Sequence, residues 1–443
     1  MRWRLIAPII IFSSLIVSCS SDNTHTTPTS ISFTSSAVRS SDTPVPPTQT
    51  LAATQTSLPT LTATRTMHQP TQTPVLTRTP IYLPYTRLTT HCLEVLESLP
   101  NNADLEGSLV LWRRGGYQEH WFDLSSRILR PLTQEGELAG TFTVSPDGSW
   151  LGYITGSPSA GYRLVISRVN EPPITIRQPM ENMDLMGWLD NEHLVLVRYQ
   201  EETYLDPLIV LNPFTGQQVE LMPDYPDIDY INGTIYWYTS RTVYDPTLTL
   251  VVYPRSGYYY NEITLWDIPN NQSLAAVPGY VSRGEHPEWS PDGETVSIVG
   301  LSPASLPNGH DFELYLVSRA GVVTQATNLS QYYTNIFIHN RSWSPDGRYI
   351  AFWLRARPIG YEGDTSPEQL LLLDTATMVT TNTCIHGGEL SGGPYWSPDG
   401  EWMAVTSQCD ESNEDCIVLV NVVENYAVRI IDQWIVSGWV VNP

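Results

Sequence analysis

The stretch Trp289-Ser290-Pro291-Asp292-Gly293 decides the fold of this chain because it recurs. Identical copies begin at Trp343 and Trp396, and Val144 to Gly148 differs from them only in its first residue. The serines of the last three copies are 54 and 53 residues apart, and the 145 residues between the first two leave room for three units of about 48. Units of roughly 40–50 residues predict the four-stranded blades of a β-propeller.

Each copy has the chemistry of a tight turn. Proline presets φ at the first turn position, aspartate is tolerated at the second, and glycine accepts conformations that other residues resist. We therefore expect each copy to join two antiparallel strands. The turn residues are Ser145, Pro146, Asp147, Gly148, Ser290, Pro291, Asp292, Gly293, Ser344, Pro345, Asp346, Gly347, Ser397, Pro398, Asp399 and Gly400.

One position in the strand after each turn is always small, four residues beyond the glycine. A small residue there is expected where adjacent sheets approach closely. The position is occupied by Gly152, Ser297, Ala351 and Ala404.

Other units are degenerate or incomplete. Gly187 to Val197 and Asp229 to Trp237 resemble weaker copies, and Arg241 to Glu262 is expected to be a loop. Gly107 to Leu124 has the later strands of a unit without a first strand, and Ser437 to Pro443 supplies a first strand alone. We predict that the C-terminal strand completes the first blade and closes a ring of seven, which abolishes free sheet edges at the closure. Counts of six or eight blades remain open.

These repeats resemble those of the TolB-like, WD40-like bacterial propellers, whose signature turn is Ser-Pro-Asp-Gly. The resemblance covers residues from about 100 to 443 and implies an all-β propeller of about seven four-stranded blades. Members of this family mostly bind partners, and a few precede catalytic domains. The fold by itself therefore does not identify an activity.

The N-terminus has the pattern of a secretory signal. Met1 to Arg4 is basic, Leu5 to Val17 is apolar, and Ser18 precedes Cys19. The apolar run is shorter than the roughly 20 residues that a membrane-spanning helix needs. Residues 16–19 resemble a lipobox, so we expect residues 1–19 to be a lipoprotein signal peptide ending at a lipidated Cys19. The alternative is ordinary cleavage nearby with an unmodified cysteine.

Residues 20–90 are rich in Thr, Ser, Pro and Gln and poor in charged and apolar residues. Such a segment cannot bury enough surface to offset its ordering entropy, so we predict a disordered linker. It would act as a stalk between the anchor and a propeller at residues 91–443. The protein is expected outside the cytoplasmic membrane, attached to the bacterial cell envelope by its lipid alone.

The charge of the chain argues against nucleic-acid binding. The sequence holds 46 acidic and 23 basic residues, and every basic residue is Arg. Residues 1–90 contain two acids and six Arg, which leaves 44 acids against 17 Arg, a net of −27, beyond them. Nucleic-acid binding requires a basic patch. An acidic surface mostly favours solubility, and we expect a monomer.

Four cysteines remain besides Cys19, an even number that favours two disulfides in an exported domain. Cys409 and Cys416 flank a short acidic loop, where a bond would connect two strands of a hairpin. By elimination, Cys92 would pair with Cys384. The alternative is free buried thiols.

Catalytic and metal-binding motifs are not recognisable in the sequence. It contains no Gly-x-Ser-x-Gly elbow, no His-Glu-x-x-His and no Cys-x-x-Cys. The acidic residues Asp410 to Asp415 are better explained as a solvated turn than as a Ca²⁺ site, since their spacing does not match an EF-hand loop. The recurring tryptophans are expected to pack between blades. We therefore predict neither a cofactor nor a metal.

The departures from the repeat are the better guide to function, because loops on a rigid scaffold carry binding. Insertions at 241–262, 301–311, 355–369 and 408–415 are predicted between the second and third strands of blades, on the face opposite the Ser-Pro-Asp-Gly turns. We expect a non-enzymatic protein that binds a protein, peptide or glycan on that face. The alternatives are an enzyme acting on polysaccharide through carboxylates in the central channel, or an envelope spacer. The candidate binding residues, chosen as Tyr and Arg, are Tyr244, Arg255, Tyr258, Tyr259, Tyr260, Arg355, Arg357 and Tyr361.

Overall fold

The computed structural model divides the chain by contacts into two units, Met1–Thr71 and Gln72–Pro443. All described residues belong to the second unit. They are 81–82, 87–100, 105–114, 116, 118–133, 137–157, 161–176, 180, 182–198, 207–221, 242–256, 261–279, 286–303, 311–361, 367–387, 392–409 and 414–442. The predicted signal peptide, Cys19, nearly all of the predicted linker and the degenerate unit at 229–237 lie outside these residues. No helix in the described part is long and apolar enough to cross a membrane.

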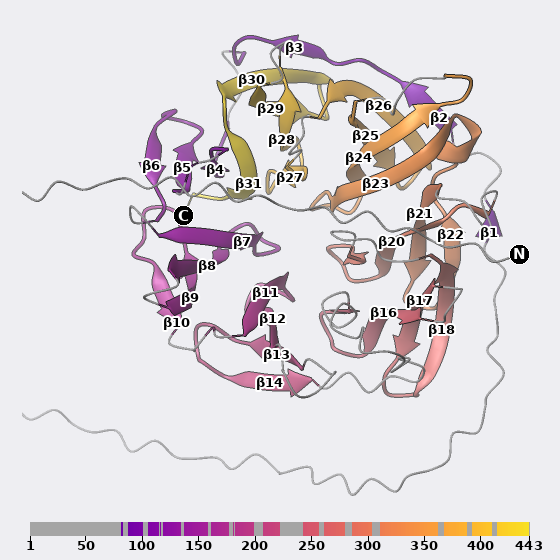
Figure 1. Ribbon diagram of the computed structural model, residues 1–443, viewed down its shortest axis with the longest axis horizontal. Coiled ribbons are helices and arrows are strands. Elements are labelled where there is room, and N and C mark those ends of the chain that lie inside the picture. Colours follow the sequence, from indigo (N-terminus) through magenta and orange to yellow (C-terminus); the bar gives the residue numbers. More distant parts are fainter. Residues whose placement is uncertain are drawn as a thin grey trace, which may run out of the picture. The chain divides into compact units, whose positions relative to one another are not determined.

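The described strands form seven sheets arranged in a ring (Figure 1). Blade 1 consists of β31 (Ile435–Val440), β4 (Ser108–Trp112), β5 (His120–Asp123) and β6 (Leu129–Pro131). Blade 2 consists of β7 (Leu138–Val144), β8 (Leu151–Ser157), β9 (Gly161–Ser167) and β10 (Ile174–Ile176). Blade 3 consists of β11 (Met183–Trp188), β12 (Leu194–Arg198), β13 (Leu208–Leu211) and β14 (Gln218–Leu221). Blade 4 consists of β15 (Val243–Tyr244), β16 (Leu250–Ser256), β17 (Asn261–Asp267) and β18 (Gln272–Pro278).

The last three blades each contain a fifth strand. Blade 5 consists of β19 (Glu288–Trp289), β20 (Thr295–Leu301), β21 (Phe312–Ser318), β22 (Val323–Gln325) and β1 (Ile81–Tyr82). Blade 6 consists of β23 (Tyr333–Trp343), β24 (Tyr349–Pro358), β25 (Gln369–Asp374), β26 (Val379–His386) and β2 (Arg87–Thr90). Blade 7 consists of β27 (Tyr395–Trp396), β28 (Trp402–Gln408), β29 (Asp415–Asn421), β30 (Tyr426–Asp432) and β3 (Glu94–Leu96). A short 3₁₀ helix, η4 (Leu329–Gln331), precedes β23.

The C-terminal strand closes the ring. β31 pairs antiparallel with β4, with Trp439 opposite Leu109, and so supplies the missing first strand of blade 1. Both the all-β propeller and the count of seven blades are thereby confirmed. Because the two ends of the domain share one sheet, blade 1 has no unpaired inner strand at the closure.

Each Ser-Pro-Asp-Gly copy connects the first and second strands of its blade through the same hydrogen bonds. In blade 5 the Ser290 hydroxyl donates to an Asp292 carboxylate oxygen at 2.5 Å and accepts from the Thr295 amide at 3.0 Å. The Gly293 amide donates to the Ser290 carbonyl at 2.8 Å, and Gly293 has a φ of 69°. Since that φ lies in the left-handed region, glycine is favoured at this position.

Blade 4 builds the same turn without the motif. The Asp245 amide donates to the Leu250 carbonyl at 3.0 Å, and Leu248, with a φ of 56°, donates to the Asp245 carbonyl at 2.9 Å. Asp245 therefore stands where the motif has serine, and the Thr247 hydroxyl donates to its carboxylate. The prediction that 241–262 is a loop is wrong, because this range contains β15, the turn and β16.

The recurring tryptophans pack between neighbouring blades, and the indoles of Trp188, Trp343 and Trp396 connect consecutive first strands. The Trp343 indole N–H donates to the Glu288 carbonyl at 3.1 Å, and the Trp396 indole donates to the Ser342 carbonyl at 3.2 Å. Trp188 makes the equivalent bond to Thr143 at 3.2 Å. The four small positions after the turns are all buried, which lets the next sheet approach. The Trp439 indole donates instead to the Glu106 carbonyl at 3.1 Å, and the buried indole nitrogen of Trp289 has no hydrogen-bond partner among the described residues.

The N-terminal part of the domain runs along the outside of three blades. β1, β2 and β3 pair in parallel with the fourth strands β22, β26 and β30, so consecutive segments cover blades 5, 6 and 7 in turn (Figure 1). We call the described residues 81–82 and 87–96 the belt. β1 and β2 lie inside the 20–90 segment predicted to be a linker, so the sheet-forming chain begins earlier than predicted. The apolar side chain of Leu88 packs against the core of blades 5 and 6, which composition alone did not indicate.

Both disulfides expected from the cysteine count are formed. Cys92 of the belt is bonded to Cys384 of β26, across 292 residues of sequence. Cys409 and Cys416 are bonded across the ends of β28 and β29, with their Cα atoms 5.9 Å apart. One bond fastens the belt to blade 6, and the other joins two strands of blade 7.

Candidate binding surface

The connections from second to third strands lie on one face of the ring. Neighbouring strands within each blade are antiparallel, so these connections leave the sheets at the ends opposite the Ser-Pro-Asp-Gly turns. We call this the long-loop face. Of the predicted loops, 257–260, 304–310, 362–366 and 410–413 lie outside the described residues, and so do Tyr258, Tyr259 and Tyr260.

The predicted binding residues do not all lie on this face as expected. Tyr244 is in β15 and only 8% exposed, so its prediction as an exposed loop residue is wrong; it packs in the core of blades 3 and 4. Arg255 is placed only by its backbone, in β16 opposite Glu262. Arg355 and Arg357 lie in the last residues of β24, where Arg355 is exposed, and Tyr361 follows the strand.

Blade 6 extends beyond its neighbours on this face. β23 and β24 have 11 and 10 residues and are the longest strands in the described part of the chain. Their far ends pair Tyr333 with Pro358 and Phe337 with Arg355. The Ile359 amide then donates to the Tyr332 carbonyl at 3.0 Å, which continues the pairing past the strand ends. We call this extension the arm.

The arm exposes large apolar side chains. Ile359 and Tyr361 are each 58% exposed, and Tyr332 and Phe337 are each 41% exposed. We call these four residues the arm patch. Arg355 lies opposite Phe337 and gives the patch a cationic edge. Tyr332, Phe337 and Ile359 were not predicted; the apolar run Ile336 to Ile338, upstream of Trp343, could have indicated a long first strand.

The inner strand of blade 5 carries an acid with an altered pKa. Burial raises the pKa of Glu288 to about 7, and the positive charge of Arg341 acts in the opposite direction. The Arg341 guanidinium donates to the Ser297 hydroxyl at 3.0 Å, which holds the cation between blades 5 and 6. Glu288 is thus a group that can exchange a proton near neutral pH.

The described residues show no cluster of three or more His, Cys, Asp or Glu side chains that could hold a metal ion. The aspartates of the repeated turns are engaged locally. Hydrogen bonds from the Ser290 hydroxyl and the Glu294 amide hold the pKa of Asp292 below its usual value. Each of these carboxylates accepts a hydrogen bond from the serine hydroxyl of its own turn.

No protein-family model and no curated protein matches this chain. Among solved structures, TolB from Acinetobacter baumannii aligns over 74% of this chain and 81% of its own, with 15% identity and a TM-score of 0.42. An oligogalacturonate lyase from Vibrio parahaemolyticus aligns over 74% and 87%, with 13% identity and a TM-score of 0.46. The β-propeller domain of the Trilobed protease from Pyrococcus furiosus aligns over 66% and 82%, with 10% identity and a TM-score of 0.41. The structural neighbours of this chain are therefore TolB and other β-propellers, as the repeats predicted, and the likeness concerns the fold alone.

Proposed function

We propose that this chain is an envelope-tethered, non-enzymatic propeller that binds a protein partner through the arm on its long-loop face. The observation that carries the proposal is the arm patch. Exposed apolar side chains gathered in one place mark interaction sites, and Tyr and Arg are the residue types enriched in interface hot spots. The tether rests on the lipobox-like sequence at Cys19 and on the Thr/Ser/Pro-rich segment after it.

A rigid support favours the arm as a binding element. The arm strands β23 and β24 belong to a five-stranded sheet whose outer edge is formed by β2, and the Cys92–Cys384 disulfide fixes the belt to β26 of that sheet. A preorganised surface loses less conformational entropy on association than a free loop does. Arg357 contributes to this order, because its guanidinium donates to the Thr334 hydroxyl at 3.4 Å across the two strands.

The binding proposal is tested by chemical cross-linking of the full-length protein in envelope membranes, followed by purification through a C-terminal tag. The test variant combines Ile359→Asp with Tyr361→Ala. The control is Val423→Asp, a residue 63% exposed in the β29–β30 turn on the opposite face. We expect the double variant to lose about tenfold of the cross-linked partner, and the control to retain it. Equal recovery of the cross-linked partner with the wild type, the double variant and the control would contradict binding through the arm.

The tether is tested separately. Cys19→Ala is expected to move the protein from the membrane fraction to the soluble fraction, because lipidation at that residue is the proposed attachment. Mass spectrometry of the N-terminal peptide checks the modification directly. An unmodified N-terminus in a protein that still sediments with membranes would contradict lipid anchoring while leaving the binding surface untouched.

A second candidate, an enzyme acting on polysaccharide, is favoured only by Glu288. Its raised pKa suits a general acid at neutral pH. Glycoside hydrolysis requires a second carboxylate about 5–10 Å away. Incubation of the protein with acidic and neutral polysaccharides, with Glu288→Gln as the control, tests this candidate. Product release that is equal for both proteins, or absent for both, argues against it.

A further inference from the structure

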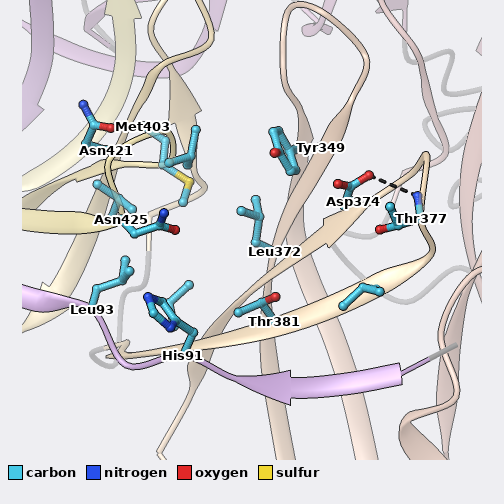
Figure 2. A pocket seen from close by; sticks show the side chains of 14 residues that line it. His91, Leu93, Tyr349, Leu372, Asp374, Thr377, Thr381, Met403, Asn421 and Asn425 are labelled. Carbon is cyan, nitrogen blue, oxygen red and sulfur yellow. Dashed lines mark hydrogen bonds between the residues drawn. The ribbon is translucent and has the colours of Figure 1, made fainter.

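A pocket of about 330 Å³ lies between blades 6 and 7, on the side of the Ser-Pro-Asp-Gly turns (Figure 2). This volume is at the lower end of the roughly 300–1,000 Å³ found for small-molecule sites. Figure 2 shows Asn425 and Met403 on one side of the space and Tyr349 and Leu372 on the other. The apolar lining residues are Leu93, Leu372, Val379, Met403, Val420 and Val422.

The pocket forms because the two sheets diverge as they leave the ring axis. Nearer the axis, the large side chains of Trp353 and Trp396 fill the same interface. Further out, β26 presents Thr381 and Thr383, which are too small to reach across. A space remains that is continuous with the core of the interface and bordered by polar groups at the turns.

The belt closes the outer side of this pocket. The His91 amide donates to the Asn382 carbonyl at 2.9 Å, and the Leu93 amide donates to the Thr383 carbonyl at 3.1 Å. Cys92, between them, is bonded to Cys384. The outer wall of the pocket is therefore the belt, which precedes both blades in the sequence and is bonded covalently to blade 6.

A neighbouring pocket provides a matched comparison. It has about 320 Å³ and lies between blades 5 and 6, and the described residues that line it all belong to those blades. Thr324 there corresponds to Thr381 here, because Thr324 pairs with Leu316 and Thr381 pairs with Leu372 at the same positions of their blades. Among the described lining residues, the belt contributes His91 and Leu93 to the first pocket and none to the second.

Apart from the imidazole of His91, the polar side chains that line the belt pocket are neutral or already paired, which favours an uncharged ligand. Its one acidic side chain, Asp374, already accepts hydrogen bonds from the Ala376 amide at 2.9 Å and from Arg348 at 3.3 Å. Burial raises the pKa of Tyr349, so its phenol stays neutral at physiological pH. The Tyr349 hydroxyl and the Asn425 carboxamide are both neutral hydrogen-bonding groups.

We propose that the pocket between blades 6 and 7 binds a small neutral molecule with an apolar body and a hydroxyl or carbonyl head, and that the disulfide-fixed belt is its outer wall. The body would lie against Leu93, Leu372 and Met403. The head would meet Tyr349 and Asn425. Binding here is independent of the arm, which lies on the opposite face.

The test is ligand-observed NMR of the full-length protein, by saturation transfer, with 1-hexanol as the probe and hexylammonium and hexanoate as charged analogues. Thr381→Phe, which fills the pocket, is expected to weaken 1-hexanol binding about tenfold. Thr324→Phe, the matched change in the neighbouring pocket, should leave it unchanged. If Thr381→Phe does not fold, as judged by circular dichroism, Leu372→Trp replaces it.

The belt wall is tested with the same probe. Replacing Cys92 and Cys384 together by serine is expected to weaken 1-hexanol binding about threefold, because the wall loses its covalent attachment. Two outcomes overturn the proposal: 1-hexanol binding that survives both pocket-filling changes, or charged analogues that bind as tightly as the alcohol. Equal weakening by Thr324→Phe would assign the signal to inter-blade spaces in general and would also overturn it.

Discussion

Blades 4 and 5 are neighbours with the same turn built from different residues. In blade 5 a serine hydroxyl donates to an aspartate, whereas in blade 4 a threonine hydroxyl donates to an aspartate at the serine position. Blade 5 places Gly293 at the residue with positive φ, and blade 4 places Leu248 there. The two blades therefore have the same turn geometry, although different residues supply its hydrogen bonds and its positive φ. The Ser-Pro-Asp-Gly sequence is not the only sequence that forms this turn.

The difference extends beyond the turn. Blades 5 to 7 carry the full motif and a belt strand, and the tryptophans of blades 6 and 7 bond to the preceding blade. Among the described residues, blade 4 has no belt strand, and the indole of Trp289, which packs against blade 4, has no hydrogen-bond partner. In the described part of the chain, blades 5, 6 and 7 are thus connected through indole bonds, whereas blades 4 and 5 are connected through the Arg319–Asp245 ion pair.

The largest expected effect concerns the belt. Replacing Cys92 and Cys384 by serine should lower the free energy of unfolding by about 5 kcal/mol, because that bond closes a loop of 292 residues. Replacing Cys409 and Cys416, separated by 7 residues, should cost about 2 kcal/mol. Denaturant unfolding of both variants measures the two values. Equal losses would show that the belt adds no constraint of its own.

The second prediction concerns the exchanged turn. The Asp245 side chain is fully buried and paired with Arg319 at 2.9 Å. Asp245→Ala should therefore cost about 3 kcal/mol, since it leaves a partly buried cation without its partner. Ser290→Ala removes local hydrogen bonds to the Asp292 carboxylate and from the Thr295 amide but breaks no ion pair, and it should cost about 2 kcal/mol. If thermal unfolding gives the reverse order, blade 4 is not held by this ion pair.

The third prediction concerns the indole contacts. Trp343→Phe removes the hydrogen bond to Glu288, whereas Trp289→Phe removes none between described residues. Both changes delete the same atoms, so the loss of unfolding free energy should be about 1 kcal/mol larger for Trp343→Phe. Chemical denaturation of the two variants tests the difference, and identical losses would contradict a role for the contact.

The smallest expected effect is a difference in pH dependence. The pKa of Asp292 is lowered in the folded protein, so its contribution to stability is present above 3.8 and is lost as the pH falls below that value. The pKa of Glu288 is raised to about 7, so its contribution is present below 4.5 and is lost as the pH rises towards 7. The stability difference between the wild type and Glu288→Gln should therefore change between pH 4.5 and 7. For Asp292→Asn it should change only below pH 3.8. Melting temperatures across this range measure both.

The sequence predicts the parts of the fold that local chemistry determines. Each residue of Ser290 to Gly293 meets a requirement of the turn by itself, so the turn can be predicted from these four residues alone. Asp245 to Leu248 meets the same requirements through a threonine hydroxyl that donates to an aspartate and a leucine at positive φ. Because none of these residues matches the motif, the sequence predicts a loop there instead of a turn.

The candidate sites were predictable only in part, for a related reason. Tyr361, Arg355 and Arg357 could be found because they interrupt the repeat. Tyr332 could not, because its exposure depends on pairing with Ile359 beyond the usual end of a blade. The pocket between blades 6 and 7 could not be predicted from the sequence, because its outer wall is the belt. Cys92 of the belt is 292 residues away from Cys384, to which it is bonded. Only the even number of cysteines pointed to that contact.

The belt also determines where a mechanical load enters the domain. A pull on the chain from the N-terminal side first strains the parallel pairing of β1 and β2, and then reaches the covalent bond at Cys92. From there the force passes into β26 of blade 6, so that β3 and the β31–β4 seam in blade 1 remain unloaded. A domain held by its N-terminal segment could thus be pulled without opening the ring at its closure.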